Sequence, residues 1–83
     1  MNWKLYSFVV RSKRRVQIIK SLEIPKTPTQ IAKDVKSSVS HISRTLKQFE
    51  EKGIIECLTP KEKVGRIYKL TKEGKKIAER IKS

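Results

Sequence analysis

Apolar residues recur at helical spacing in the first two thirds of this sequence and change to extended spacing in the last third. Val16, Ile19 and Leu22 are three residues apart, which places them on one face of a helix. Ser12 stands before them as a candidate N-cap, because a serine side chain satisfies free backbone N–H groups at a helix start. The pattern therefore predicts a first helix over Lys13–Leu22.

The beginning of this first helix is open to two interpretations. Leu5, Phe8 and Val9 continue its apolar face towards the N-terminus. That spacing fits one longer helix, and it fits equally a separate turn ahead of Ser12.

Two further helices follow, with a short polar break between them. Thr29 is a candidate cap for a second helix over Gln30–Val35. Residues 36–39 interrupt the pattern, because consecutive serines favour local hydrogen bonds to the backbone. Ser40 then caps a third helix that ends at Gly53, where glycine supplies a left-handed terminal residue. The residues expected to turn inward are Ile31, Ala32, Val35, Val39, Ile42, Leu46 and Phe49.

Beyond the third helix the period becomes extended. Ile54–Leu58 and Arg66–Leu70 predict two strands joined by the loop Thr59–Gly65. Thr71 caps a final helix over Lys72–Lys82. This order predicts an α+β, mostly helical fold of the winged helix-turn-helix class, with a three-helix core, a two-stranded β-hairpin wing and a C-terminal helix.

The charge of the chain narrows the choice of partner. Lys and Arg number 21 against 8 Asp and Glu, which gives a net charge of +13. The basic residues are spread over every third of the sequence, so the charge belongs to a surface and not to one tail. A chain of 83 residues supports one core, and we expect a single DNA-binding domain over residues 1–83. Double-stranded DNA is the expected partner, and no apolar run is long enough to span a membrane.

The residues that enzymes and metal sites need are absent from the sequence. Cys57 is the only cysteine and His41 the only histidine, so neither a disulfide nor a pair of metal ligands at the usual spacing can form. His41 has no evident nucleophile or carboxylate partner, and no phosphate-cradling glycine loop is present. We therefore expect no enzyme, no metal or other cofactor and no small-molecule ligand. The expected location is the reducing cytoplasm, in association with the nucleoid.

The solvent face of the third helix carries the chemistry that suits DNA. This face is polar and positive until near the helix end, and Arg44 can make a bidentate contact with guanine O6 and N7. The alternative is a merely solvated charged face, which the lack of carboxylates beside Arg44 disfavours. The residues expected to read bases, from a helix over about 40–52 in the major groove, are Ser40, His41, Ser43 and Arg44.

A second set of residues is expected to position the duplex. The start of the second helix attracts phosphate through its free amides, and the wing, residues 59–66, suits the adjacent backbone or minor groove. The expected backbone contacts are Thr27, Thr29, Gln30, Ser38, Lys47, Lys61, Lys63 and Arg66. The basic cluster Arg11, Lys13, Arg14 and Arg15 fits either flanking phosphate or a solvated helix start.

Aromatic and aliphatic residues are dense near the N-terminus. The residues concerned are Trp3, Leu5, Tyr6, Phe8 and Val9. Exposed aromatic residues at this density are unusual on a monomer, so the core and a dimer contact are equally good interpretations. We expect a homodimer that reads two half-sites about one helical turn apart.

Two motifs, together with stretches along most of the chain, resemble a known family. The motifs are Glu50-Glu51-Lys52-Gly53 and Leu70-Thr71-Lys72-Glu73-Gly74, and the stretches are Ser12–Leu22, Lys26–Lys33, His41–Leu46, Phe49–Pro60 and Gly65–Tyr68. They are similar to the small archaeal winged helix-turn-helix transcriptional regulators related to the MarR and ArsR groups. The resemblance implies this fold, a recognition helix and a DNA target. The long dimerising helices of fuller MarR-like proteins and the cysteine clusters of metal-sensing ArsR-like proteins are missing, so we expect neither an inherited effector pocket nor metal sensing.

Three functions remain in competition. The leading one is a sequence-specific regulator of transcription that binds double-stranded DNA. The charge spread fits a non-specific architectural or chromatin protein equally well, and a single salt dependence for every sequence would favour it. The third is an RNA-associated or protein-docking winged helix, against which the hydrogen-bonding side chains of the third helix argue.

Overall fold

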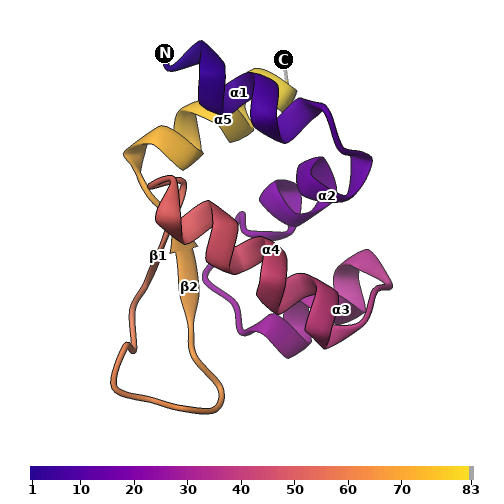
Figure 1. Cartoon of the computed structure of the whole chain (residues 1–83), viewed down its shortest axis with the longest axis vertical. Helices are drawn as coiled ribbons and strands as arrows, with labels where there is room; N and C mark the ends of the chain where they lie inside the picture. Colours follow the sequence, from indigo (N-terminus) through magenta and orange to yellow (C-terminus); the bar gives the residue numbers. More distant parts are fainter. Residues whose placement is uncertain (83) are drawn as a thin grey trace.

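The computed structural model describes residues 1–82, which form five helices and a two-stranded antiparallel sheet that leads into the wing (Figure 1). The elements are α1 (Trp3–Val10), α2 (Lys13–Ser21), α3 (Pro28–Val35), α4 (Val39–Glu51), β1 (Ile55–Cys57), β2 (Tyr68–Leu70) and α5 (Lys72–Lys82). None of the helices within residues 1–82 has the length and apolar character needed to cross a membrane.

The helices and the hairpin form a winged helix-turn-helix, as the sequence predicts. The helix α3 packs against both α2 and α4, and α5 packs against α2 and β2. The connection between the two strands extends away from the helices as the wing, and α1 and α5 lie at the opposite end of the molecule (Figure 1). The fold therefore has a wing end and an opposite end formed by α1 and α5.

The residues before Ser12 form a separate helix, which decides between the two interpretations of the N-terminal segment. Asn2 caps α1, since its side-chain oxygen accepts from the backbone N–H groups of Lys4 and Leu5 at 3.1 and 3.2 Å. Ser12 has an extended backbone, with φ −127° and ψ 123°, and its side chain accepts from the N–H of Arg15. A residue in this conformation ends one helix and caps the next.

The second and third predicted helices begin earlier than the sequence indicates. Thr27, and not Thr29, caps α3, where it forms a reciprocal capping box with Gln30. Pro28 occupies the first turn, where its missing N–H costs nothing. Ser38, and not Ser40, caps α4. Each predicted cap is two residues late because both segments offer two hydroxyl residues two positions apart, and the backbone geometry selects the first.

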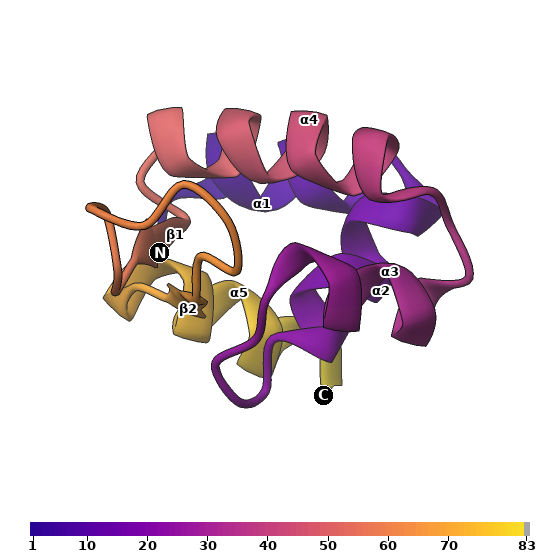
Figure 2. The same cartoon turned by 90° about the horizontal axis from the view of Figure 1, so that it is seen from below.

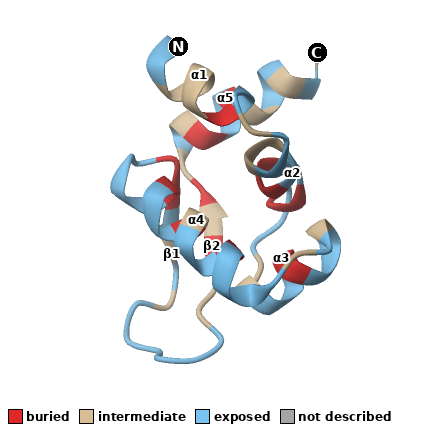
Figure 3. Ribbon diagram, turned by 45° about the vertical axis from the view of Figure 1, so that its right-hand side comes forward, coloured by how far each residue is buried: buried red, intermediate tan, exposed pale blue. Residues whose placement is uncertain are grey.

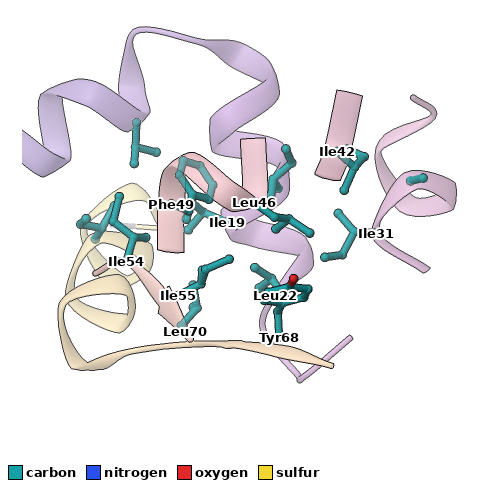
Figure 4. Close-up of a cluster of buried hydrophobic side chains, with 14 residues drawn as sticks. Ile19, Leu22, Ile31, Ile42, Leu46, Phe49, Ile54, Ile55, Tyr68 and Leu70 are labelled. Carbon is teal, nitrogen blue, oxygen red and sulfur yellow. The ribbon is translucent and has the colours of Figure 1, made fainter. Parts of the chain in front are cut away.

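The core lies where α2, α4 and the sheet face one another. Side chains from these elements meet in one cluster (Figure 4), and Ile31 joins it from α3. The buried apolar residues are Val9, Ile18, Ile19, Leu22, Ile31, Ala32, Ile42, Leu46, Phe49, Ile54, Ile55, Tyr68, Leu70 and Ile77. Ile18 is a buried residue that the predicted stripe of α2 did not include. It is covered because α2 packs against α1, α3 and α5 together.

The sheet is shorter than predicted and is extended by one bridge. Its strands span 55–57 and 68–70, inside the predicted ranges, and Cys57 pairs with Tyr68 at the end nearest the wing. Lys26, in the connection between α2 and α3, pairs with Tyr68 through two backbone hydrogen bonds of 3.1 and 2.9 Å. The chain that leads into α3 is thereby fastened to the second strand of the wing.

Gly74 allows α5 to pack closely on the chain that leads into β1. A Cβ atom added at Gly74 would stand 2.1 Å from the carbonyl oxygen of Ile54. Thr71, the cap of α5, donates its backbone N–H to the same oxygen at 3.0 Å, and its hydroxyl oxygen accepts from the N–H of Gly74. The approach leaves no room for a side chain, because the clashing atom belongs to the backbone.

We expect Gly74→Ala to lower the free energy of unfolding by about 1–3 kcal/mol, the usual cost of overpacking. Glycine to alanine in a helix without such a contact stabilises by roughly 0.5–1 kcal/mol, so the sign of the change is the test. Urea denaturation measures it, and Lys75→Ala, an exposed change on the same helix, is the control. A Gly74→Ala variant as stable as the native chain would contradict the close approach.

Candidate nucleic-acid interface

The helix α4 has one buried and one exposed face. Ile42, Leu46 and Phe49 are no more than 1% exposed, and together they fix the rotation of the helix about its axis. The outer face of α4 is open to solvent (Figure 3). The residues placed on it are Ser40, His41, Ser43, Arg44 and Lys47, all of them exposed.

The sequence analysis expected Val39 to turn inward with the other apolar residues of α4, and the structure shows that it does not. It is the first residue of the helix and is 44% exposed. Its position follows from the cap at Ser38, which starts the helix before Val39. Val39 therefore belongs to the outer surface.

A groove of about 320 Å³ lies between α4, the start of α3 and the wing. Figure 2 shows these three parts around one open face of the molecule. The residues that line the groove are Pro28, Thr29, Val39, Ser43, Lys63, Val64, Gly65, Arg66 and Tyr68. The structure thus brings residues of all three predicted contact regions to one hollow surface.

The wing carries three basic residues, of which Lys61 and Lys63 form no ion pair within residues 1–82 and Arg66 braces the loop. Lys61 and Lys63 are exposed. The Nε of Arg66 donates to the carbonyl of Glu62 at 2.6 Å, so part of the guanidinium group is committed to holding the loop. Val64, at 87%, is the most exposed large apolar residue in the described chain.

The candidate contacts at the helix starts have a structural role as caps. The Thr27 hydroxyl oxygen accepts from the N–H of Gln30, and the Gln30 side-chain oxygen accepts from the N–H of Thr27. The Ser38 hydroxyl oxygen accepts from the N–H of His41 at 3.2 Å. A hydroxyl that accepts in this way still has its own hydrogen to donate. Thr29, which follows Thr27 and Pro28, is exposed.

Arg14 reaches the start of α4 from α2. Its Nη1 lies 3.1 Å from Nδ1 of His41, and both residues are exposed. The sequence analysis assigned Arg14 either to flanking phosphate or to a solvated helix start, and did not connect it with His41. A local sequence pattern cannot indicate a contact between residues 27 positions apart.

A polar cluster fixes the connection between α2 and α3. Lys26 Nζ forms an ion pair with Asp34, and the buried hydroxyl of Ser21 donates to the same carboxylate oxygen at 2.8 Å. These hydrogen bonds, from Lys26 above all and then from Ser21, lower the pKa of Asp34 below its ordinary value of 3.8. The cluster ties the end of α2 to α3, and the sequence analysis did not find it.

The apolar residues near the N-terminus are divided between core and surface. Val9 is fully buried, so of the two interpretations of this segment, core or dimer contact, Val9 belongs to the core. Leu5, Tyr6 and Phe8 pack partly against the core, whereas Trp3 is 58% exposed. The aromatic rings of Trp3 and Tyr6 meet edge to face at 5.7 Å.

Cations cover the aromatic rings at this end of the molecule. The guanidinium of Arg15 lies 3.9 Å from the centre of the Phe8 ring, and its Nη1 donates to the Phe8 carbonyl. Arg80 of α5 lies 5.6 Å from the centre of the Trp3 ring and so connects α5 with α1. Part of the Arg15 guanidinium group is thereby committed to contacts within the fold.

No group of three or more His, Cys, Asp or Glu residues that could hold a metal ion occurs within residues 1–82. Cys57 is a free, partly buried thiol in β1. The chemistry of the interface is therefore that of hydroxyl, imidazole, amide and cationic groups.

A known protein family matches almost the whole chain. The model of the family described as the HVO_A0261 N-terminal domain matches residues 3–83. No curated protein sequence matches the chain significantly.

Solved structures share the fold over nearly the whole chain. The reduced form of MarR from E. coli is 25% identical, with a TM-score of 0.77 over 93% of this chain and 59% of that one. A MarR family transcriptional regulator, SPO1453 from Silicibacter pomeroyi, is 16% identical, with a TM-score of 0.75 over 94% of this chain and 59% of that one. TubR of type III plasmid segregation is 19% identical, with a TM-score of 0.79 over 95% of this chain and 82% of that one. The chain spans 59% of the length of the two MarR-type structures.

We expect Asp34→Asn to lower the melting temperature at pH 7, because the ion pair with Lys26 is lost. A carboxylate with a depressed pKa stabilises the fold above its unfolded value and loses that contribution as the pH falls through its folded value. The difference between native chain and variant should therefore shrink as the pH falls below 3.8. Thermal melts between pH 7 and pH 2 measure it.

Glu51→Gln is the matched control, since it removes one exposed carboxylate from the end of α4. Its melting temperature should follow that of the native chain at every pH. An Asp34→Asn difference that stays constant across this range would mean that the carboxylate charge does not stabilise the turn.

Proposed function

The chain belongs to the HVO_A0261 N-terminal domain family, and from its fold and interface we propose that it regulates transcription by binding double-stranded DNA in a sequence-specific way. One observation carries this proposal. Buried Ile42, Leu46 and Phe49 hold α4 so that its polar, basic face is open beside the wing. An α-helix presented in this way fits the major groove of B-DNA.

Base reading is assigned to the first turns of α4. Ser40, His41 and Ser43 carry short polar groups near the helix start, and Arg44 follows on the same exposed face. A bidentate contact of arginine with guanine contributes about 1–3 kcal/mol of discrimination against a wrong base. Arg44 has no ion-pair partner among the described residues, so its guanidinium is free to make this contact.

Positioning on the duplex is assigned to groups around the groove. Lys47 follows Arg44 along α4, and Lys61 and Lys63 are exposed on the wing. Contacts of this kind set register and orientation but do not read sequence. The residues with supporting roles are Thr27, Thr29, Gln30, Ser38 and Arg66.

A homodimer is the proposed binding unit, formed through the end of the molecule opposite the wing. Exposed Trp3 and partly buried Leu5, Tyr6 and Phe8 gather there on α1. Two copies joined through this end leave both α4 helices free for two half-sites of one operator. The likeness to MarR supports a role in transcriptional regulation. The resemblance to small archaeal regulators supports an archaeal source. A regulator of this kind acts in the cytoplasm, at the nucleoid.

We expect Arg44→Ala to weaken binding to the preferred duplex by about 1–3 kcal/mol and to relax base preference at one position. Lys63→Ala should weaken binding to every duplex alike and reduce the salt dependence by about one charge. Fluorescence anisotropy with the preferred and with scrambled duplexes, over a range of salt concentrations, distinguishes the two effects. Lys75→Ala removes a charge from α5, away from the groove, and should leave base preference unchanged.

The same titrations decide between the proposed function and its competitors. Equal affinity of the native chain for all duplexes, with one salt slope, would identify a non-specific architectural protein. Competition by duplex RNA at equal concentration would indicate an RNA-associated protein instead. An Arg44→Ala loss that is the same on every sequence would place Arg44 on phosphate.

We expect Trp3→Ala to shift the chain from dimer to monomer while binding to an isolated half-site is kept, because Trp3 is the most exposed ring of the α1 end. Light scattering coupled to size exclusion measures the mass, and Val64→Ala, an exposed apolar change on the wing, is the control. A native chain that stays monomeric on DNA would contradict the dimer.

A further inference from the structure

The contact between Arg14 and His41 joins α2 to the start of α4. Arg14 Nη1 lies 3.1 Å from His41 Nδ1, within hydrogen-bonding distance. His41 is itself placed by the cap of α4, since its backbone N–H donates to the Ser38 hydroxyl. The backbone of His41 is therefore fixed by the helix cap, and its imidazole ring is contacted by Arg14.

The chemistry of arginine determines which ring nitrogen of His41 carries the proton. A guanidinium group has hydrogen-bond donors and no acceptor. Nδ1 of His41 must therefore accept, which requires a neutral ring whose proton is on Nε2. Protonation of Nδ1 would set two donors against each other and would place two cations in contact.

We propose that Arg14 is a positioning residue for base reading: it holds His41 in the Nε2–H tautomer, so that α4 presents a hydrogen-bond donor to an acceptor on a base edge in the major groove. This inference rests on the proposed function. Within residues 1–82, Nε2 of His41 has no hydrogen-bond partner, and the residue is exposed. The donor is thus free for a ligand.

The preference that follows is specific. Guanine presents O6 and N7 in the major groove, thymine presents O4 and adenine presents N7, and all of these accept. Cytosine presents only the N4 amino donor there. His41 in this tautomer therefore discriminates against cytosine at the base that it faces, and tolerates the other three.

Arg14 acts on this reading through His41 and not through its charge. Lys13 precedes it on the same helix and is exposed, and no ion pair or hydrogen bond of its side chain is found among the described residues. Arg14→Met and Lys13→Met each remove one positive charge, but only the first removes the donor to His41. The two variants separate the positioning role from simple attraction to DNA.

The first test uses the free protein. Long-range proton–nitrogen spectra at a pH where His41 is neutral should show only the Nε2–H form in the native chain and in Lys13→Met. Arg14→Met should show an added population with the proton on Nδ1. The same mixture of tautomers in all three proteins would overturn the proposal.

The second test uses DNA. Duplexes that differ only in the base facing His41 are identified as those whose ranking changes in His41→Ala. On an acceptor base, Arg14→Met and His41→Ala should each weaken binding roughly two- to tenfold, the range for one net hydrogen bond. The double variant should lose little more than His41→Ala together with the charge effect measured in Lys13→Met. Fully additive losses, or an Arg14→Met loss that equals the Lys13→Met loss, would overturn the proposal.

The outcomes separate this inference from the proposed function. If the native chain binds no duplex, the proposed function fails and this inference fails with it, even where the spectra show one tautomer. If the chain binds a preferred duplex through Arg44 but the ranking of bases is unchanged in His41→Ala, the function stands and the role of His41 is refuted. Circular dichroism checks that each variant is folded, which exposed positions should permit.

Discussion

The burial of three side chains on α4 is the constraint on which the interface depends. Ile42, Leu46 and Phe49 have almost no exposed area, and removing one large side chain from such a core costs several kcal/mol. That cost prevents the helix from turning about its axis. The opposite face is thereby fixed relative to the wing, and His41 on it is held in addition by its contact with Arg14.

Two sets of polar contacts fix the segments on either side of α4 and the sheet. Asp34, with Lys26 and Ser21, fixes the turn from α2 into α3. Thr71 and Gly74 fix the entry into α5 by their close contacts with the Ile54 carbonyl. Both sites use polar groups to join segments that apolar packing alone would leave free to slide, because hydrogen bonds are directional and dispersion contacts are not.

The sequence predicts the order of elements and most of the core, because burial at helical spacing is recorded in local pattern. It misplaces both caps of the helix-turn-helix, since Thr27 competes with Thr29 and Ser38 with Ser40, and the backbone geometry that decides between them is not visible in the sequence. The contact of Arg14 with His41 could not be predicted from the sequence for a different reason. A contact between exposed side chains of two helices leaves no mark in periodicity or composition.

The bridge between Lys26 and Tyr68 has a mechanical consequence for recognition. Two backbone hydrogen bonds fasten the segment before α3 to the second strand, so the base of the hairpin and the start of α3 are parts of one rigid frame. The hairpin therefore cannot tilt against the helices to fit a duplex whose groove width is unfavourable. In the proposed complex with DNA, the duplex would therefore have to deform to fit the protein, so that stiff and pliable sequences would differ in binding energy even at base pairs that no side chain touches.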